Sequence, residues 1–87
     1  MTNVFHRTLK STPPNAIGGQ GVYLFDKQGN KYLDASGGAA ISCLGHQNPI
    51  VVDAIKEQAS KLAYAHTGFF SNEPAERLAE MLVERAP

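Results

Sequence analysis

The chain has 87 residues, of which 43% are hydrophobic, and its eight basic side chains balance eight acidic ones. This balance argues against a nucleic-acid-binding protein, which usually gathers a basic excess on one face, and against a highly charged disordered tail. With a single cysteine, no bilayer-length apolar run and no apolar signal-peptide region, we expect one small domain at most, in the reducing cytoplasm and without an internal disulfide.

The first twenty residues combine serine, threonine, proline and glycine with little periodicity. Such a composition is typical of loops. We therefore expect residues 1–20 to form an N-terminal arm that is ordered only where another part of the protein covers it.

Residues 21–44 are expected to form strands. Residues 22–25 are β-branched and aromatic, a composition that suits a pleated surface, and residues 31–34 return as the second strand of a hairpin. Gly29 supplies the left-handed position that the connection between them needs. A bend of small residues, 35–40, then leads into residues 41–44, for which the composition predicts a third strand.

The pattern of residues 48–87 predicts two amphipathic helices. Asn48 is a favourable N-cap and Pro49 takes the first helical position, while the second helix begins near Ser71 or Asn72. Apolar residues recur on one face of each helix: Val51, Ile55, Ala59 and Leu62 in the first, and Ala75, Leu78, Ala79, Leu82 and Val83 in the second. One hairpin and two helices give little basis for independent folding, so we expect a piece of a larger protein.

The glycine-rich stretches do not match phosphate-binding loops. Residues 36–40 are not followed by the lysine of a Walker loop, and residues 18–21 precede a strand rather than a helix. A structural turn is therefore the first interpretation of both stretches. For residues 36–40 the alternative is a pocket wall, because small side chains leave room for a ligand.

The histidines and the cysteine do not form a recognisable catalytic or metal-binding pattern. No histidine shares a helix face with a second ligand, so no metal site is predicted. His46 lies between Gly45 and the Asn48 cap, where a turn-stabilising hydrogen bond is expected. Cys43 lacks an activating partner in the sequence and is interpreted as a buried structural thiol. No residue is named as catalytic on this basis.

Two adjacent aromatic residues, Phe69 and Phe70, follow Gly68 in the loop between the predicted helices. In the first interpretation, one ring packs inward and the other covers a neighbouring surface. In the alternative, the two rings form an aromatic wall for a ligand, as pockets often do.

The motifs of residues 18–87 follow one another in an order and spacing that are specific only when taken together. Gly21–Asp34 carries a hairpin pattern with one aspartate, Asp26, after its first strand and another, Asp34, at its end. Gly45–Pro49 reads Gly-His-x-x-Pro, and Phe69–Pro74 joins the aromatic pair to a helix start. In this order they resemble the opening segment of class III pyridoxal-phosphate-dependent aminotransferases.

The resemblance implies the α+β N-terminal part of a fold type I enzyme that works as a homodimer: a small antiparallel meander or hairpin followed by two amphipathic helices. Residues 21–87 would be the N-terminal segment of its small domain, and the large cofactor domain would be absent. In the family, a pyridoxal phosphate held by a lysine carries an amino group from an amine or amino acid to a keto acid. The cofactor-binding groups lie beyond the matched segment. The resemblance thus implies no catalytic, cofactor-binding or metal residue here, and an inactive chain when alone.

The resemblance also implies a substrate-binding role for four residues. Ala39 and Ala40 fall where relatives often carry a larger residue against the substrate, and Phe70, less directly Phe69, falls where relatives present an aromatic ring to the pocket, often across the dimer. Two alanines would enlarge that pocket, and no tyrosine hydroxyl stands there to bind a substrate carboxylate. An apolar or bulky amino donor, as in ω-transaminases, is therefore expected over ornithine.

Two other functions stay open on the sequence. A complete 87-residue interaction module could use its helix stripes to bind a partner or itself. A related cofactor enzyme, such as an aminomutase or decarboxylase, could contain a similar segment. Association of the isolated chain through exposed apolar surface would favour the aminotransferase segment, whereas a compact, stable monomer would favour the module.

Overall fold

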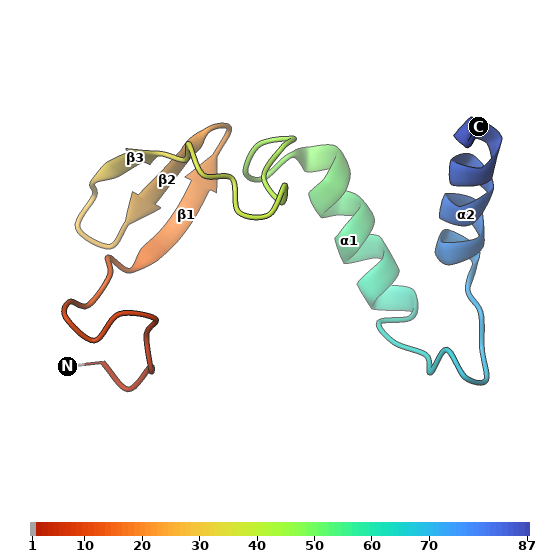
Figure 1. Ribbon diagram of the computed structural model, residues 1–87, viewed down its shortest axis with the longest axis horizontal. Helices are drawn as coiled ribbons and strands as arrows, with labels where there is room; N and C mark the ends of the chain where they lie inside the picture. Colours follow the sequence, from red (N-terminus) through yellow and green to blue (C-terminus); the bar gives the residue numbers. More distant parts are fainter. Residues whose placement is uncertain (1) are drawn as a thin grey trace. The chain divides into compact units, whose positions relative to one another are not determined.

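The computed structural model describes residues 2–87, and Figure 1 shows its three strands and two helices. These residues form two units that divide between Val52 and Asp53. The first unit holds a sheet and the bend that follows it. The second holds most of one helix, a loop and a second helix. The expected α+β order, a small antiparallel meander followed by two helices, is confirmed.

The sheet is an antiparallel meander in the order β1 (Ala16–Gln20), β2 (Tyr23–Asp26) and β3 (Lys31–Leu33). Gln20 pairs with Tyr23, so Gly21 and Val22 form a two-residue turn between β1 and β2. Gly21 has a φ of +59°, as the turns that join twisted antiparallel strands require.

The connection from β2 to β3 is built around the carboxylate of Asp26, a side chain only 3% exposed. Its Oδ1 accepts hydrogen bonds from the backbone N–H groups of Gln28 and Asn30, both at 2.9 Å. Its Oδ2 accepts from the Asn30 side-chain amide at 2.9 Å and the Tyr32 hydroxyl at 2.8 Å. Gly29 has a φ of +87°, which confirms its predicted left-handed position.

These four donors stabilise the ionised form of the Asp26 carboxyl. The side-chain amide of Asn30 makes the largest contribution, and together the donors lower the pKa of Asp26 from 3.8 to about 2 against the opposing effect of burial. The same interaction raises the pKa of Tyr32, whose hydroxyl donates to a negative oxygen.

The sheet differs from the sequence prediction at both of its ends. β1 begins at Ala16, inside the segment expected to be an arm up to residue 20, because its backbone pairs with β2 although its composition does not suit a strand. The third strand predicted at residues 41–44 is wrong. The N–H groups of Ile41 and Ser42 both donate to the carbonyl of Gly37, at 3.1 Å each, which curls this segment into turns.

A short backbone bridge joins His46, at the end of the bend, to the sheet. The N–H of His46 donates to the Gly21 carbonyl at 2.7 Å, and the N–H of Gly21 donates to the His46 carbonyl at 3.2 Å. Gly19 makes room for this contact. A Cβ atom at Gly19 would lie 2.8 Å from the His46 Cβ, whereas one at Gly18 would meet nothing within 4 Å.

Both helices begin at the predicted caps. The Oδ1 of Asn48 accepts from the N–H of Ile50 at 3.0 Å and starts α1 (Pro49–Lys61). The Oδ1 of Asn72 accepts from the N–H of Ala75 at 3.0 Å and starts α2 (Glu73–Arg85). Each side chain satisfies a donor that the first helical turn leaves free.

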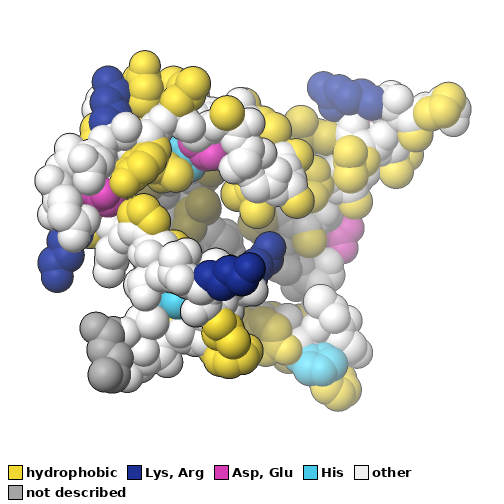
Figure 2. Space-filling model, turned by 60° about the vertical axis from the view of Figure 1, so that its left-hand side comes forward, with side chains coloured by type: hydrophobic (Ala, Val, Ile, Leu, Met, Phe, Trp, Pro, Cys, Tyr) yellow, Lys and Arg dark blue, Asp and Glu magenta, His cyan; other side chains and the backbone are white. Residues whose placement is uncertain are grey.

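No hydrophobic side chain in the described residues is buried. The apolar residues of α1 and α2 are largely exposed, and Figure 2 shows hydrophobic side chains open at the surface of the face that it presents. The prediction that Cys43 is a buried thiol is wrong: the residue is exposed, because the part of the chain that the structure describes has no hydrophobic core to cover it. Within residues 2–87, neither helix has the length and hydropathy that crossing a bilayer requires.

The Gly19→Ala variant should weaken the bridge between the sheet and the segment at His46. The added methyl group needs space that the His46 side chain occupies, and overpacking of this kind costs about 1–3 kcal/mol. The amide hydrogens of Gly21 and His46 should then exchange about 5- to 160-fold faster, as measured by NMR. Gly18→Ala is the matched control, and equal exchange in the two variants would contradict the close approach.

The Asp26 carboxyl should titrate near pH 2, well below its ordinary pKa of 3.8. Because the folded pKa is the lower one, ionised Asp26 stabilises the turn above about pH 4, and this contribution disappears as the pH falls to about 2. Carbon-detected NMR of the carboxyl group measures the midpoint. Tyr32→Phe removes one donor and should move the midpoint upward, whereas Tyr64→Phe should leave it unchanged. A midpoint near 3.8 in the unchanged chain would contradict the network.

Candidate functional site

The bend between Asp34 and His46 carries the two alanines that the sequence assigns to the substrate side. It starts where β3 ends, and its first backbone bond, from the N–H of Asp34 to the carbonyl of Val22, holds it to the sheet at 2.8 Å. Inside the bend, Gly37 and Gly38 have φ values of +61° and +64°. These left-handed residues let the chain reverse direction within a few positions.

Asp34 organises the bend through both oxygens of its carboxylate. Oδ1 accepts from the N–H of Gly37 at 3.1 Å and the hydroxyl of Ser36 at 3.2 Å. Oδ2 accepts from the hydroxyl of Ser42 at 3.1 Å and bonds the Nε2 of His46 at 2.7 Å. Because an ionised carboxylate only accepts hydrogen bonds, Nε2 is the donor in this last pair.

The pKa of Asp34 follows from these contacts. The Gly37 backbone N–H makes the largest contribution, followed by His46 and Ser42, and they lower the pKa from 3.8 to about 2 although partial burial opposes them. Asp34 therefore stays ionised at neutral pH. All its close partners lie within the bend, so its role here is to hold the backbone.

Ala39 and Ala40 lie in the turn at the far end of the bend and are exposed. Ala40 has a φ of +60°, in the left-handed region that favours glycine. It also lines an open pocket of about 330 Å³ between the bend and the start of α1. The other residues that line this pocket are Ile41, Cys43, Leu44, Gly45, Gln47, Asn48, Val51 and Val52.

Phe69 and Phe70 lie in a tight turn of the second unit. The N–H groups of both residues donate to the His66 carbonyl at 3.0 Å, and the Phe69 ring lies 5.3 Å from the His66 ring. Phe69 is 81% exposed and Phe70 is 66% exposed. The first interpretation, in which one of the two rings packs inward, is therefore wrong. The alanines and the phenylalanines belong to different units, and their meeting in one pocket stays a prediction.

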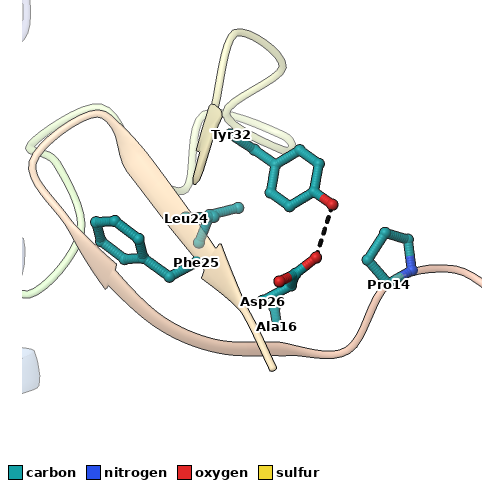
Figure 3. A pocket seen from close by; sticks show the side chains of 6 residues that line it. All are labelled: Pro14, Ala16, Leu24, Phe25, Asp26 and Tyr32. Carbon is teal, nitrogen blue, oxygen red and sulfur yellow. Dashed lines mark hydrogen bonds between the residues drawn. The ribbon is translucent and has the colours of Figure 1, made fainter. Parts of the chain in front are cut away.

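A second pocket, of about 180 Å³, lies against the sheet and was not expected from the sequence (Figure 3). Its lining residues are Pro14, Ala16, Leu24, Phe25, Asp26 and Tyr32. Figure 3 shows the Tyr32 hydroxyl directed at the Asp26 carboxylate, which already accepts four hydrogen bonds. Asp26 therefore acts as a structural acceptor rather than as a free acid or base.

The lysines of the chain do not fit a covalent site for pyridoxal phosphate. All five are exposed. The Nζ of Lys61 donates to Glu57 at 3.0 Å, which raises its pKa, and the Nζ of Lys31 lies 3.8 Å from the centre of the Tyr23 ring. A lasting covalent bond between a lysine and this cofactor needs a pocket that shields it from water, and these exposed lysines have none. No step through this cofactor is assigned to these residues.

Sequence reasoning found the hydrogen-bonding role of His46 but missed its partner. The signal at Asp34 was available: an aspartate at the end of a strand, followed three residues later by glycine, favours a turn closed by the side chain. The bond from Ser42 spans eight residues and had no local signal. Among the described residues, no group of three or more histidine, cysteine or acidic side chains could hold a metal ion.

Comparison with known proteins assigns the chain to a family. The model of the class III aminotransferases matches residues 6–87. Over 68 residues, the chain is 48% identical to the acetylornithine aminotransferase of Vibrio vulnificus, an alignment that covers 78% of this chain and 17% of that protein.

Two solved structures share the fold of the chain. The taurine:2-oxoglutarate aminotransferase of Bifidobacterium kashiwanohense, in complex with PLP and glutamate, is 36% identical with a TM-score of 0.78 over 97% of this chain and 18% of its own. The omega transaminase of Pseudomonas jessenii, in complex with PMP, is 28% identical with a TM-score of 0.77 over 95% of this chain and 20% of its own.

The chain spans about a fifth or less of the length of the curated relatives that it matches. It thus corresponds to a segment of an aminotransferase, which is consistent with the N-terminal segment expected from its motifs. The family match over nearly the whole chain confirms the resemblance seen in the sequence. The chain is a member of the class III aminotransferase family.

Proposed function

We propose that the chain serves as the N-terminal segment of a pyridoxal-phosphate-dependent aminotransferase, which moves an amino group from an amine or amino acid to a keto acid. The observation that carries this proposal is the family match over residues 6–87 in a chain that spans only a fifth of its relatives. Its exposed apolar surface supports the same conclusion, because a segment of a larger fold leaves its buried faces open when it stands alone.

In the complete enzyme the cofactor would supply the electron sink for the reaction. The five exposed lysines do not suit its covalent attachment, so that group and the chemistry around it belong to the rest of the protein. What this segment contributes is a wall for the substrate and contacts between subunits. The 87-residue chain alone is inactive under this proposal.

The substrate wall is assigned to Ala39, Ala40, Phe69 and Phe70. The exposed positions of all four support this assignment, since each side chain is free to face a ligand. Small residues at the tip of the bend leave space for an apolar or bulky amino donor. The fold shared with an omega transaminase supports such a donor, whereas the identity to an acetylornithine aminotransferase makes an acylated ornithine the competing candidate.

Two further features of the proposal concern assembly and location. The enzyme would act as a homodimer in which the Phe69–Phe70 loop reaches toward the pocket of the other subunit. The exposure of both rings supports this, because an apolar loop of this kind needs a covering surface. The proposed compartment is the cytoplasm, since a lone cysteine suits a reducing environment.

Pyridoxal phosphate added to the 87-residue chain should not be retained. With one equivalent of cofactor followed by dialysis, we expect no absorbance from a lysine-bound cofactor, because water hydrolyses an imine formed on an exposed lysine and dialysis removes the released aldehyde. A complete class III aminotransferase treated in the same way is the positive control. Retained cofactor that borohydride fixes to a single lysine of the chain would overturn the assignment of this chemistry to the rest of the protein.

In the complete enzyme, Ala39→Trp should reduce kcat/KM for a bulky amine about tenfold or more, with little change for a small donor. The indole would fill space that the bulky donor needs, and steric mismatches of this size discriminate by about 10- to 200-fold. Steady-state kinetics with both donors measures the effect. Ala39→Ser keeps the side chain small and is the matched control. Unchanged kcat/KM for the bulky amine would remove Ala39 from the pocket.

A further inference from the structure

We infer that Asp34 and His46 are positioning residues for the amino donor, because their hydrogen bond closes the base of the bend that carries Ala39 and Ala40. The inference rests on the proposed function, which places these alanines against the donor. Neither Asp34 nor His46 is assigned a contact with the substrate. They act through the backbone between them.

The pair joins the two ends of the bend directly. The Asp34 Oδ2 and His46 Nε2 atoms are 2.7 Å apart, and the two side chains are only 12% and 23% exposed. A hydrogen bond to an ionised acceptor is stronger than a neutral one, and shielding from water strengthens it further. Eleven residues, 35–45, therefore form a loop that is closed by a side-chain contact at its base.

His46 is itself bonded to the sheet, which holds the Asp34–His46 pair in place. Its backbone exchanges two hydrogen bonds with Gly21, and its side chain lies where a Cβ atom on Gly19 would clash. Asp34 follows β3 and is held to Val22. Both ends of the bend are thus bonded to the β-meander, so the position of the sheet determines the position of the bend.

The interior of the bend needs this closure because its backbone adopts conformations that are unfavourable in free energy. Gly37, Gly38 and Ala40 all have positive φ values, and for alanine such a conformation persists only when its surroundings enforce it. The Asp34 carboxylate provides that restraint through Gly37 and Ser42 as well as His46. When the base opens, the alanines lose their fixed place at the tip.

The test uses His46→Asn and His46→Gln in the complete aminotransferase that contains this segment. A glutamine amide reaches about as far as Nε2 and can still donate to Asp34, whereas the shorter asparagine cannot. His46→Asn should lower the ratio of kcat/KM for a bulky donor to that for a small donor about tenfold, because only the bulky donor reaches the bend. His46→Gln should restore the ratio to within about threefold of the unchanged enzyme. His6→Asn, in the N-terminal region, should leave it unchanged.

This ratio separates positioning from simple stability. A variant that only unfolds part of the enzyme lowers both kcat/KM values by the same factor, so their ratio stays constant. Gly19→Ala provides an independent second variant, since it displaces His46 without removing a polar group, and Gly18→Ala is its matched control. We expect the ratio to fall in Gly19→Ala and not in Gly18→Ala.

Hydrogen exchange at the Gly37 and Ser42 amides gives a readout that does not depend on activity. Faster exchange in His46→Asn, with rescue in His46→Gln and a fallen donor ratio, supports the inference. Unchanged exchange or an unchanged ratio overturns it. If Ala39→Trp still alters the donor ratio in that case, the proposed function stands and only the positioning role fails. If Ala39→Trp is also without effect, the pocket assignment itself is wrong.

Discussion

The carboxylate of Asp34 accepts hydrogen bonds from donors on both arms of a bend, and one of these donors, His46, is bonded in turn to the sheet. Asp26 plays the corresponding role in the turn between β2 and β3. Since no hydrophobic side chain of the described residues is buried, these two charged acceptors and the backbone pairing of the strands hold the first unit together. Short-range polar networks thus hold the shape that a core would hold in a complete domain.

The parts of the fold that could be predicted from the sequence are those that a few adjacent residues decide. Asn48 with Pro49 and Asn72 with Pro74 mark helix starts, since each asparagine satisfies a free backbone donor and proline suits the first turn. Gly29 marks a turn for a similar reason. The family followed from the order of such local signals, which the match over residues 6–87 confirms.

The parts that could not be predicted depend on contacts between distant residues. β1 forms because its backbone pairs with β2. Gly19 leaves space for the side chain of His46, which lies 27 positions further along the chain. Residues 41–44 have a composition typical of strands, but the N–H groups of Ile41 and Ser42 donate to the Gly37 carbonyl and form turns instead. Cys43 is of a residue type that is usually buried, but residues 2–87 contain no buried hydrophobic residue that could form a core around it. For the candidate site, the alanines and phenylalanines were assigned from the family resemblance and stay a prediction. The hydrogen-bonding role of His46 was expected from the sequence, but its partner Asp34 was identified only in the structure.

The left-handed backbone at Ala40 limits which side chains can replace this alanine at the proposed substrate wall. Ala39 has no such constraint, so side chains of many shapes are compatible with its backbone. At Ala40, a β-branched or bulky side chain would meet its own carbonyl groups unless the peptide rotated out of this conformation. Libraries of variants at these positions should therefore tolerate many side chains at Ala39 and few at Ala40, whichever amine is used for selection.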